Sequence, residues 1–552
     1  MLVTDCPGLL AAERLDGARA GAAPLARVVA SLVERAAGCD MLARAARASL
    51  AAAGGEEAVA RHQGRTDLLK LRLFQLVDAA PPGLLGAALG PPVLRRVFQV
   101  LARGAGRGAR TTLLHEYLTP EDDALFPDRA APEAGGGGGG ARRDGPDSGS
   151  VAEEAHAEWA LGWEERAGPS EARTLEVWAE DIRSCLLPGR PLAVQLADAA
   201  VPLFVRVFPA APVRDQLAAL AAVLDSVVLA GAAAEPGSPA LTNCVAALLA
   251  ALKHQAELGH APPSSPEWHT RITAILRAAL SAPPLLVRRA AAEALGLLLR
   301  LSSDAQLDAT VRALLAPPPA PASAARPAPL GAAADAPADA PAAWLGVDSV
   351  PGHALALGCV FRYAGAVRVS RLAVAAAATD RVLEWARGGG LARAWSLHAL
   401  ALMAEYAPPD APRLAARALA LLRSLFFVDD DAAGAGAGAG GAPRPHPPLM
   451  VSLARLAGAL LALLGPELRA GAPELRAVQA VAEELRCAEG DGPASGFSAA
   501  ARCVEAVELA HRQLLFAPRA CAPAAVAADL AALLAHPGAA VRRGALACLR
   551  QL

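Results

Sequence analysis

The stretch PPLLVRRAAAEALGLLLRL, residues 283–301, has a partial copy at the other end of the chain, HPGAAVRRGALACLRQL, residues 536–552. In both, a turn that contains proline precedes Val-Arg-Arg, and small residues then separate the arginines from a leucine. The aligned residues are Val287, Arg288, Arg289 and Leu295 in the first copy and Val541, Arg542, Arg543 and Leu549 in the second. Alanine and leucine favour helices, and alanine also lets neighbouring helices approach closely. The two stretches therefore predict the same helix of a repeated helical unit.

A proline turn, Val-Arg and alanine-rich spacing form the pattern of the second helix of a HEAT repeat. Paired amphipathic segments recur along the chain, with apolar residues at steps of three and four. The predicted pairs are 214–231 with 241–256, 268–280 with 285–301, 391–406 with 411–428, and 449–464 with 474–488. We therefore predict an all-α fold, an α-solenoid (superhelix) of HEAT/armadillo-like helical-hairpin repeats. The arginine pair is expected to lie along the solenoid edge and to bond carbonyls or acids of the adjacent repeat.

Three low-complexity segments interrupt the helical pattern. Glycine dominates 129–150, proline alternates with alanine in 316–343, and 429–448 combines three aspartates with Gly-Ala repeats and prolines. Solenoids tolerate such insertions between repeats, so we expect disordered Gly/Pro/Ala-rich insertions. The predicted divisions are 1–119, N-terminal helical repeats; 120–172, a Gly-rich linker with a short acidic helix that contains tryptophan; 173–315, HEAT repeats; 316–345, a Pro/Ala linker; 346–428, HEAT repeats; 429–448, a Gly/Ala/Pro linker; and 449–552, C-terminal HEAT repeats truncated mid-repeat.

The composition excludes some partners. Hydrophobic residues form 54% of the chain but aromatic residues only 4%, which favours packed helices over sheets. The formal net charge is −2 and the pI about 6.6, so no overall field attracts nucleic acid or anionic membrane. Lys70 and Lys253 are the only lysines among 52 basic residues. We interpret the arginine excess as codon bias and not as phosphate recognition.

The cysteines and the N-terminus suggest a reducing compartment. Asp5 and Glu13 interrupt the N-terminal region where a signal peptide needs an apolar core. Charged residues or prolines break each apolar stretch before it reaches the length that spans a bilayer. No CxxC pair is present, and the cysteines are predicted to be small buried residues. The nine cysteines are Cys6, Cys39, Cys185, Cys244, Cys359, Cys487, Cys503, Cys521 and Cys548.

No residue is assigned a catalytic, cofactor-binding or metal-binding role. His353 and His398 lie in segments rich in alanine and leucine, without clustered acids or cysteines, and are predicted to be packing or hydrogen-bonding histidines. Neither a P-loop nor a G-x-S-x-G elbow occurs. Trp385, Trp395 and Met403 are predicted to fill the core between helices.

Two charged clusters admit a functional interpretation beside a simpler one. The first surrounds Trp159 and Trp163 and could supply paired carboxylates or a docking peptide, but a solvated amphipathic helix is preferred. Its charged members are Glu153, Glu154, His156, Glu158, Glu164 and Glu165. The second could bind nucleic acid or phosphoinositides, but Phe98 is its single aromatic residue and a solvated loop is preferred. Its members are Arg95, Arg96, Arg103, Arg107 and Arg110.

Several segments resemble the HEAT repeat-containing protein 5 family. Four of them occur in the order found in that family: GHALALGCVFRY (352–363), AWSLHALALMAEY (394–406), LGPEL (464–468) and LLFAPR (514–519). Upstream, DAAVPLFVRVF (198–208), LVRRAAAEALGLL (286–298) and KLRLFQLVDAAPP (70–82) are also similar to it. Members are very long HEAT solenoids, represented in plants by Sweetie-type proteins, that associate with the type-1 clathrin adaptor and its accessory proteins.

The resemblance implies a non-enzymatic protein–protein interaction scaffold in vesicle-mediated transport. Its partners would be clathrin adaptor complex 1 and accessory proteins, and its processes endocytosis, retrograde transport from endosome to Golgi and protein localization. The expected location is the cytosol, with peripheral association, through partners, with endosomes, the trans-Golgi network and endocytic vesicles. Because members are several times longer and the chain stops inside a predicted helix, a fragment or truncated gene model is expected.

Two alternatives stay open. The chain could be a HEAT-repeat scaffold of another kind, a cargo carrier or a phosphatase-type scaffold. A carrier would be expected to place acidic residues and Trp/Asn ladders at repeat spacing on the inner helices, and no such ladder is visible in the sequence. An enzyme with an unrecognised site would need a pocket of convergent titratable groups.

Overall fold

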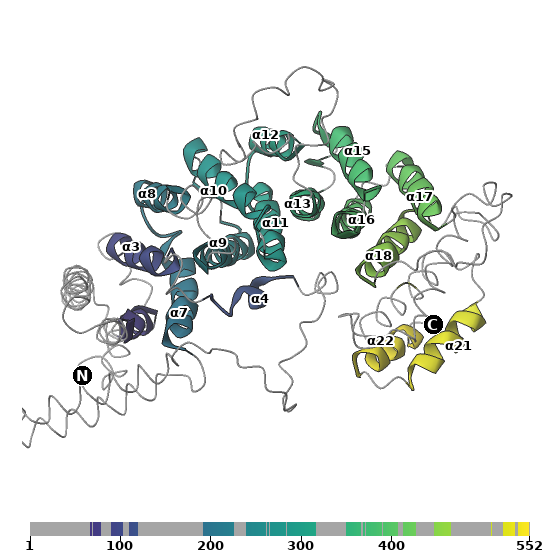
Figure 1. The fold of residues 1–552 in the computed structure, drawn as a ribbon, viewed down its shortest axis with the longest axis horizontal. Helices are drawn as coiled ribbons and strands as arrows, with labels where there is room; N and C mark the ends of the chain where they lie inside the picture. The colour runs from purple at the N-terminus through teal and green to yellow at the C-terminus, as the bar shows by residue number, and fades with distance from the viewer. Residues whose placement is uncertain are drawn as a thin grey trace, which may run out of the picture. The chain divides into compact units, whose positions relative to one another are not determined.

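The all-α fold predicted from the sequence is confirmed. The computed structural model describes residues 67–68, 70–78, 90–102, 110–119, 191–225, 239–260, 262–263, 265–282, 284–315, 349–365, 368–369, 371–388, 390–406, 412–426, 447–464, 509, 523–535 and 539–550. These residues form helices and connecting turns, with no strand among them (Figure 1). The chain divides into two compact units: unit 1 comprises Met1–Leu118 with Gly139–Ala279, and unit 2 comprises Thr119–Gly138 with Leu280–Leu552. The division falls inside the predicted block 173–315.

Unit 1 packs its helices in two layers. Its described helices are α3 (Gly90–Leu101), α4 (Leu114–Tyr117), α7 (Leu192–Val207), α8 (Val213–Val223), α9 (Pro239–Leu258) and α10 (Pro266–Ala279). Helix α7 packs against α3 and α9, while α8 packs against α10. We call α7 and α9 the core row of unit 1. Aromatic rings fill the space beside it, where Phe204 stacks on Phe208 at 4.6 Å between ring centroids and meets Phe98 edge-on at 5.1 Å.

Unit 2 has the same two-layer arrangement over more helices. They are α11 (Leu285–Arg300), α12 (Asp304–Leu315), α13 (Val350–Ala364), α15 (Ala375–Ala386), α16 (Gly390–Glu405), α17 (Pro412–Phe426), α18 (Pro447–Leu464), α21 (Pro523–Leu533) and α22 (Ala539–Leu549). The most extensive contacts join α11 to α13, α13 to α16 and α16 to α18, which we call the core row of unit 2. Helices α12, α15 and α17 form a cover row beside it (Figure 1).

The rows explain how the predicted hairpins pack. Described helices form in all four predicted pairs, but the largest contacts run along the core row and not within the pairs. Helix α16, for example, packs far more extensively against α13 and α18 than against α17, its predicted partner. This is the stacking of a solenoid, in which each repeat is stabilised by its neighbours. Three core-row helices of unit 2 are buried on every side, from Val287 to Leu299 in α11, from Val350 to Phe361 in α13 and from Ala394 to Ala404 in α16. Helices that are apolar all round are expected to be buried in this way.

Two glycines set the spacing of the core row. A Cβ atom placed on Gly296 of α11 would lie 2.7 Å from the Cys359 carbonyl oxygen of α13. A Cβ atom on Gly358 of α13 would lie 2.8 Å from the Cα atom of Ala399 in α16. Backbone atoms cannot withdraw as a flexible side chain can, so both helix pairs are too close for any larger residue. The close approach expected from the small-residue spacing is therefore present.

Three sequence expectations need correction or limits. Pro447 and Pro448 were predicted to end a linker, but they begin α18, because proline is well suited to the first turn of a helix. The other parts of the three low-complexity segments lie outside the described residues, as does the predicted helix 474–488. The arginines of the two aligned copies also differ: Arg288 and Arg289 are buried, whereas Arg542 and Arg543 are exposed.

The substitution Gly296→Ala tests the close approach of α11 and α13. Alanine should improve helix propensity by about 1 kcal/mol, whereas overpacking against backbone costs up to about 3 kcal/mol. We expect the free energy of unfolding to fall by roughly 1–2 kcal/mol, with a larger loss for Gly296→Val, measured by urea denaturation followed by circular dichroism. Ala309→Gly on the exposed face of α12 is the control, and it reports helix propensity alone. A more stable Gly296→Ala chain would contradict the packing described.

Candidate interaction site

A carboxylate on α7 holds two consecutive threonines. One Asp198 oxygen accepts hydrogen bonds from the Thr111 hydroxyl at 2.7 Å and the Thr112 backbone N–H at 2.8 Å. Its other oxygen accepts a bond from the Thr112 hydroxyl at 2.9 Å. Hydrogen bonds to a charged acceptor are roughly twice as strong as neutral ones. Asp198 therefore fixes both the backbone and the side chains of this dipeptide.

Helix α9 contacts the same segment at two further points. The Asn243 side-chain oxygen accepts the Thr111 backbone N–H at 2.8 Å, and the Lys253 ammonium donates to the Tyr117 carbonyl oxygen. The short helix α4 lies between these points and packs on α9, with Leu114 buried. We call Asp198, Asn243 and Lys253 the polar ladder. Residues 110–118 are thus bound to the core row of unit 1 through backbone groups on both sides of the α4 turn.

Unit 2 holds Thr119 by a similar arrangement. The Glu293 carboxylate accepts bonds from the Thr119 backbone N–H at 3.1 Å and from the Thr119 hydroxyl at 2.9 Å. Arg289 donates to the Thr119 carbonyl oxygen. The Tyr363 hydroxyl lies 2.9 Å from the Thr119 hydroxyl. We call Arg289, Glu293 and Tyr363 the threonine clamp.

The threonine clamp carries a buried ion pair. Arg289 and Glu293 are 1% and 0% exposed, and the Arg289 Nε lies 3.5 Å from a Glu293 oxygen. Burying two charges is costly unless each is paired and its remaining hydrogen-bonding capacity is used. Thr119 supplies both kinds of partner, two donors for the carboxylate and a carbonyl for the guanidinium. Burial first, and then the Glu293 charge, raise the pKa of Tyr363, so this hydroxyl stays neutral.

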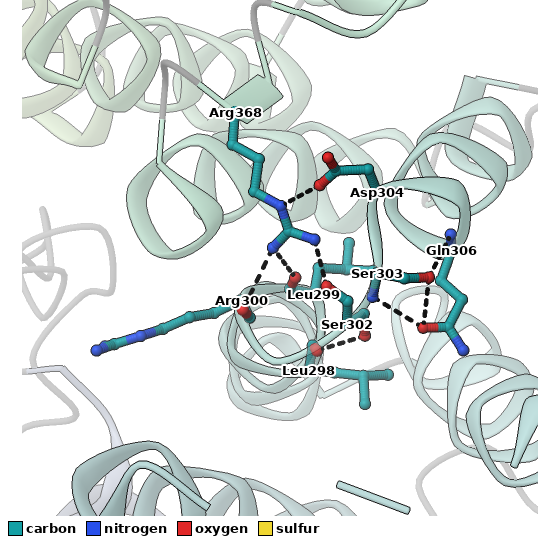
Figure 2. A network of polar contacts seen from close by, with 8 residues as sticks. All are labelled: Leu298, Leu299, Arg300, Ser302, Ser303, Asp304, Gln306 and Arg368. Atoms are coloured by element: carbon teal, nitrogen blue, oxygen red, sulfur yellow. Dashed lines mark hydrogen bonds and ion pairs between the residues drawn. The ribbon is translucent and has the colours of Figure 1, made fainter. Parts of the chain in front are cut away.

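Arg368 joins neighbouring repeats at the surface of unit 2. It follows α13, and its guanidinium donates to the carbonyl oxygens of Leu299 at 3.0 Å and of Ser302, at the end of α11 (Figure 2). It also pairs with the Asp304 carboxylate in the first turn of α12. The last carbonyls of a helix have no partner within it and favour a cation. One side chain therefore satisfies the end of α11 and fixes the start of α12.

The turn between α11 and α12 is closed by a capping box. The Ser303 N–H donates to the Gln306 side-chain oxygen at 3.0 Å, and the Gln306 N–H donates to the Ser303 hydroxyl at 3.4 Å (Figure 2). This reciprocal pattern satisfies two N–H groups that the first turn of a helix leaves without partners. Arg368 therefore contacts a turn whose own geometry is fixed.

The histidines and large apolar residues singled out in the sequence occupy the core. His353 is buried, and its Nδ1 lies 2.9 Å from the Ser349 carbonyl oxygen in the preceding turn. His398 is buried on α16. Trp385, Trp395 and Met403 are buried, as predicted for residues that fill the space between helices.

The basic run that begins at Arg95 was predicted to be a solvated loop, and this prediction is wrong for its first two arginines. Arg95 and Arg96 lie on α3, because the apolar residues of VLRRVFQVL follow a helical period after two prolines suited to the first turn. Arg96 donates to Gln99 on the same helix at 2.7 Å. Phe98 is buried and so cannot stack on a base. Arg110 is exposed, and Arg103 and Arg107 lie outside the described residues.

The remaining candidates add no site. The acidic cluster around Trp159 and Trp163 and six of the nine cysteines lie outside the described residues. Cys244, Cys359 and Cys548 are buried thiols, and burial raises the pKa of Cys244 to about 12. Within the described ranges no three His, Cys, Asp or Glu side chains gather as metal ligands. None of the helices in those ranges is both long and apolar enough to cross a membrane.

Sequence reasoning missed the polar ladder and the threonine clamp. The core-row helices α7, α9 and α11 carry Asp198, Asn243 and Glu293. A cargo carrier was expected to place acidic residues and asparagines on its inner helices, but the sequence showed no ladder of them. Each of the three is a polar residue in a segment rich in alanine and leucine, which was a usable signal. Its partner threonine was not identifiable, because it lies 87 to 174 residues away in the chain.

Comparison with known proteins does not identify a family for this chain. No protein-family model matches the chain. Among solved structures, the crystal structure of an engineered protein aligns over 87% of this chain and 98% of its own, at 14% sequence identity and a TM-score of 0.28. A TM-score this low supports no argument about fold or function.

The substitution Glu293→Gln tests the buried ion pair. Glutamine keeps the size and an acceptor oxygen but leaves the Arg289 charge buried without its counter-charge, which costs about 3–5 kcal/mol when a buried pair is broken. Glu384→Gln is the matched control, because Glu384 pairs with Arg381 at 2.8 Å on an exposed surface, where the effect should stay below about 1 kcal/mol. Urea unfolding of both chains gives the comparison, and equal losses of stability would contradict the role assigned to Glu293.

Proposed function

We propose that this chain is a non-enzymatic protein–protein interaction scaffold in vesicle-mediated transport that acts with clathrin adaptor complex 1 and its accessory proteins. Its place is the cytosol, with peripheral association, through partners, with endosomes, the trans-Golgi network and endocytic vesicles. The processes are endocytosis, retrograde transport from endosome to Golgi and protein localization. The observation that carries the proposal is the ordered set of segments that resemble the HEAT repeat-containing protein 5 family.

Four of the seven resembling segments lie on core-row helices. DAAVPLFVRVF lies largely on α7, LVRRAAAEALGLL on α11, GHALALGCVFRY on α13 and AWSLHALALMAEY largely on α16. Most of their residues are buried, and they include Gly296 and Gly358, which set the helix spacing. The resemblance therefore concerns how helices stack. Contacts with an adaptor must be made by other, exposed residues.

The cover row of unit 2 offers such residues. Helices α12, α15 and α17 expose charged side chains of both signs, including Arg312, Asp380, Glu384 and Arg417. Asp380 on α15 pairs with Arg417 on α17, so the charges also connect adjacent repeats. A surface of mixed charge with few large apolar groups suits the polar rim of a partner interface. The mechanism proposed is physical, in that partner segments lie along stacked helices and the ridges between repeats.

A cargo carrier is the second candidate, and the polar ladder favours it. Asp198, Asn243 and Lys253 bind backbone groups of residues 110–118, and a carrier would use such groups to bind a cargo peptide. Both candidates are interaction proteins, and they differ in what is bound and where. No observation favours a phosphatase-type scaffold.

Affinity capture of the tagged chain from its native cytosol, with mass spectrometry of the bound proteins, tests the adaptor assignment. We expect the wild-type chain to recover clathrin-adaptor subunits and accessory proteins. Glu293→Gln should recover less as the fold weakens, since a partner binds the folded state. A folded bait that enriches other proteins without adaptor subunits would remove the trafficking assignment.

A further inference from the structure

Residues 110–118 lie on a surface formed by α7 and α9. The segment bends at Thr112, forms the single turn of α4, and is extended at Leu118. Its backbone groups are bound by side chains and not by a neighbouring strand or a continuing helix. Nothing in these contacts requires the peptide to belong to the same chain, apart from the covalent connection.

The ladder specifies what such a peptide must contain. Both Asp198 oxygens accept hydroxyl hydrogens, one from Thr111 and one from Thr112, so two adjacent residues must carry hydroxyl groups. Thr111, Leu114 and Leu118 are buried, which places an apolar anchor three and seven residues after the first hydroxyl. A peptide that makes the same contacts therefore needs two adjacent Ser or Thr residues, then any one residue, a leucine, any three residues and a second leucine.

Charge restricts the occupant further. The two hydroxyl groups meet a carboxylate, and the Thr112 side chain is exposed at its rim. A phosphate on either hydroxyl would remove the donor hydrogen and place negative charge against Asp198. The surface thus selects the unphosphorylated form.

We propose that the α7–α9 face of unit 1 is a peptide-docking site, occupied in cis by residues 110–118, which a partner segment with the same hydroxyl–hydroxyl–leucine pattern displaces. The cis segment acts as a built-in competitor, because a tethered copy is present at an effective concentration in the millimolar range. The inference rests on the interaction-scaffold part of the proposed function and is independent of the clathrin adaptor.

The test uses the whole 552-residue chain and a fluorescent peptide with the sequence of residues 108–118, GARTTLLHEYL. The double substitution Thr111→Val and Thr112→Val in the chain removes both hydroxyl bonds to Asp198 at nearly constant side-chain volume. It weakens the cis segment while the ladder stays intact. We expect this chain to bind the peptide at least about tenfold more tightly than the wild-type chain, measured by fluorescence polarisation, because the loss of one hydrogen bond to a charged group changes affinity by roughly that factor.

Two controls locate the binding. A peptide with valines in place of both threonines, GARVVLLHEYL, should bind the doubly substituted chain at least about tenfold more weakly than GARTTLLHEYL. Adding Asn243→Ala to that chain should weaken binding of GARTTLLHEYL by a similar factor, with circular dichroism used to confirm that the chain stays folded. Thr112→Glu in the otherwise wild-type chain should raise its affinity for GARTTLLHEYL, since the new carboxylate is repelled by Asp198.

Two results would overturn the proposal. One is equal affinity of the wild-type and doubly substituted chains for GARTTLLHEYL, which would mean that the cis segment does not occupy the binding surface. The other is equal affinity for the two peptides, which would mean that Asp198 does not read the hydroxyl groups. No adaptor is present in this assay, so a failed adaptor capture and a failed peptide test are distinguishable.

Discussion

The distance between core-row helices is the constraint on which unit 2 depends. At Gly296 and Gly358 the backbone of one helix lies so close to the next that a Cβ atom would overlap it. Such spacing requires glycine and alanine at the contacts and leucine and valine around them, which accounts for an apolar fraction with few aromatic residues. The same spacing makes contacts along the row more extensive than those between a core helix and its cover helix.

Close stacking determines where polar groups can go. A helix buried all round cannot expose a carboxylate or an amide, so Asn243 and Glu293 need partners inside the protein. The half-buried Asp198 is held in a similar way. Residues 110–119 supply those partners through threonine hydroxyls and backbone N–H groups. Arginines satisfy carbonyl groups in the same way, Arg288 at Ala282 in the turn before α11 and Arg368 at the end of α11. In these places the arginine excess has a structural use, whatever its origin in codon usage.

Local sequence patterns predicted the helices, but they could not predict contacts between residues that are far apart in the chain. The Val-Arg-Arg and alanine pattern correctly located α11 and α22, and the low aromatic content correctly indicated an all-α fold. The fate of the arginines could not be predicted, because identical Arg-Arg pairs are buried at 288–289 and exposed at 542–543. What differs is the environment, which for Arg289 includes Glu293 one turn away and Thr119, 170 residues earlier. The prediction of a solvated loop at Arg95 and Arg96 was wrong for a simpler reason. It was based on the number of arginines, although the apolar residues of the same segment recur with the spacing of a helix.

Hydrogen exchange of the 552-residue chain, read by mass spectrometry, tests the central claim that the core row stabilises the fold. Amides exchange at rates set by the free energy of local opening, and the most enclosed helices open last. The account predicts the slowest exchange in α11, α13 and α16, with faster exchange in the cover helices α12 and α15. Exchange in α13 as fast as in α12 would contradict it, because a row held by backbone contacts at Gly296 and Gly358 cannot open before the helices that cover it.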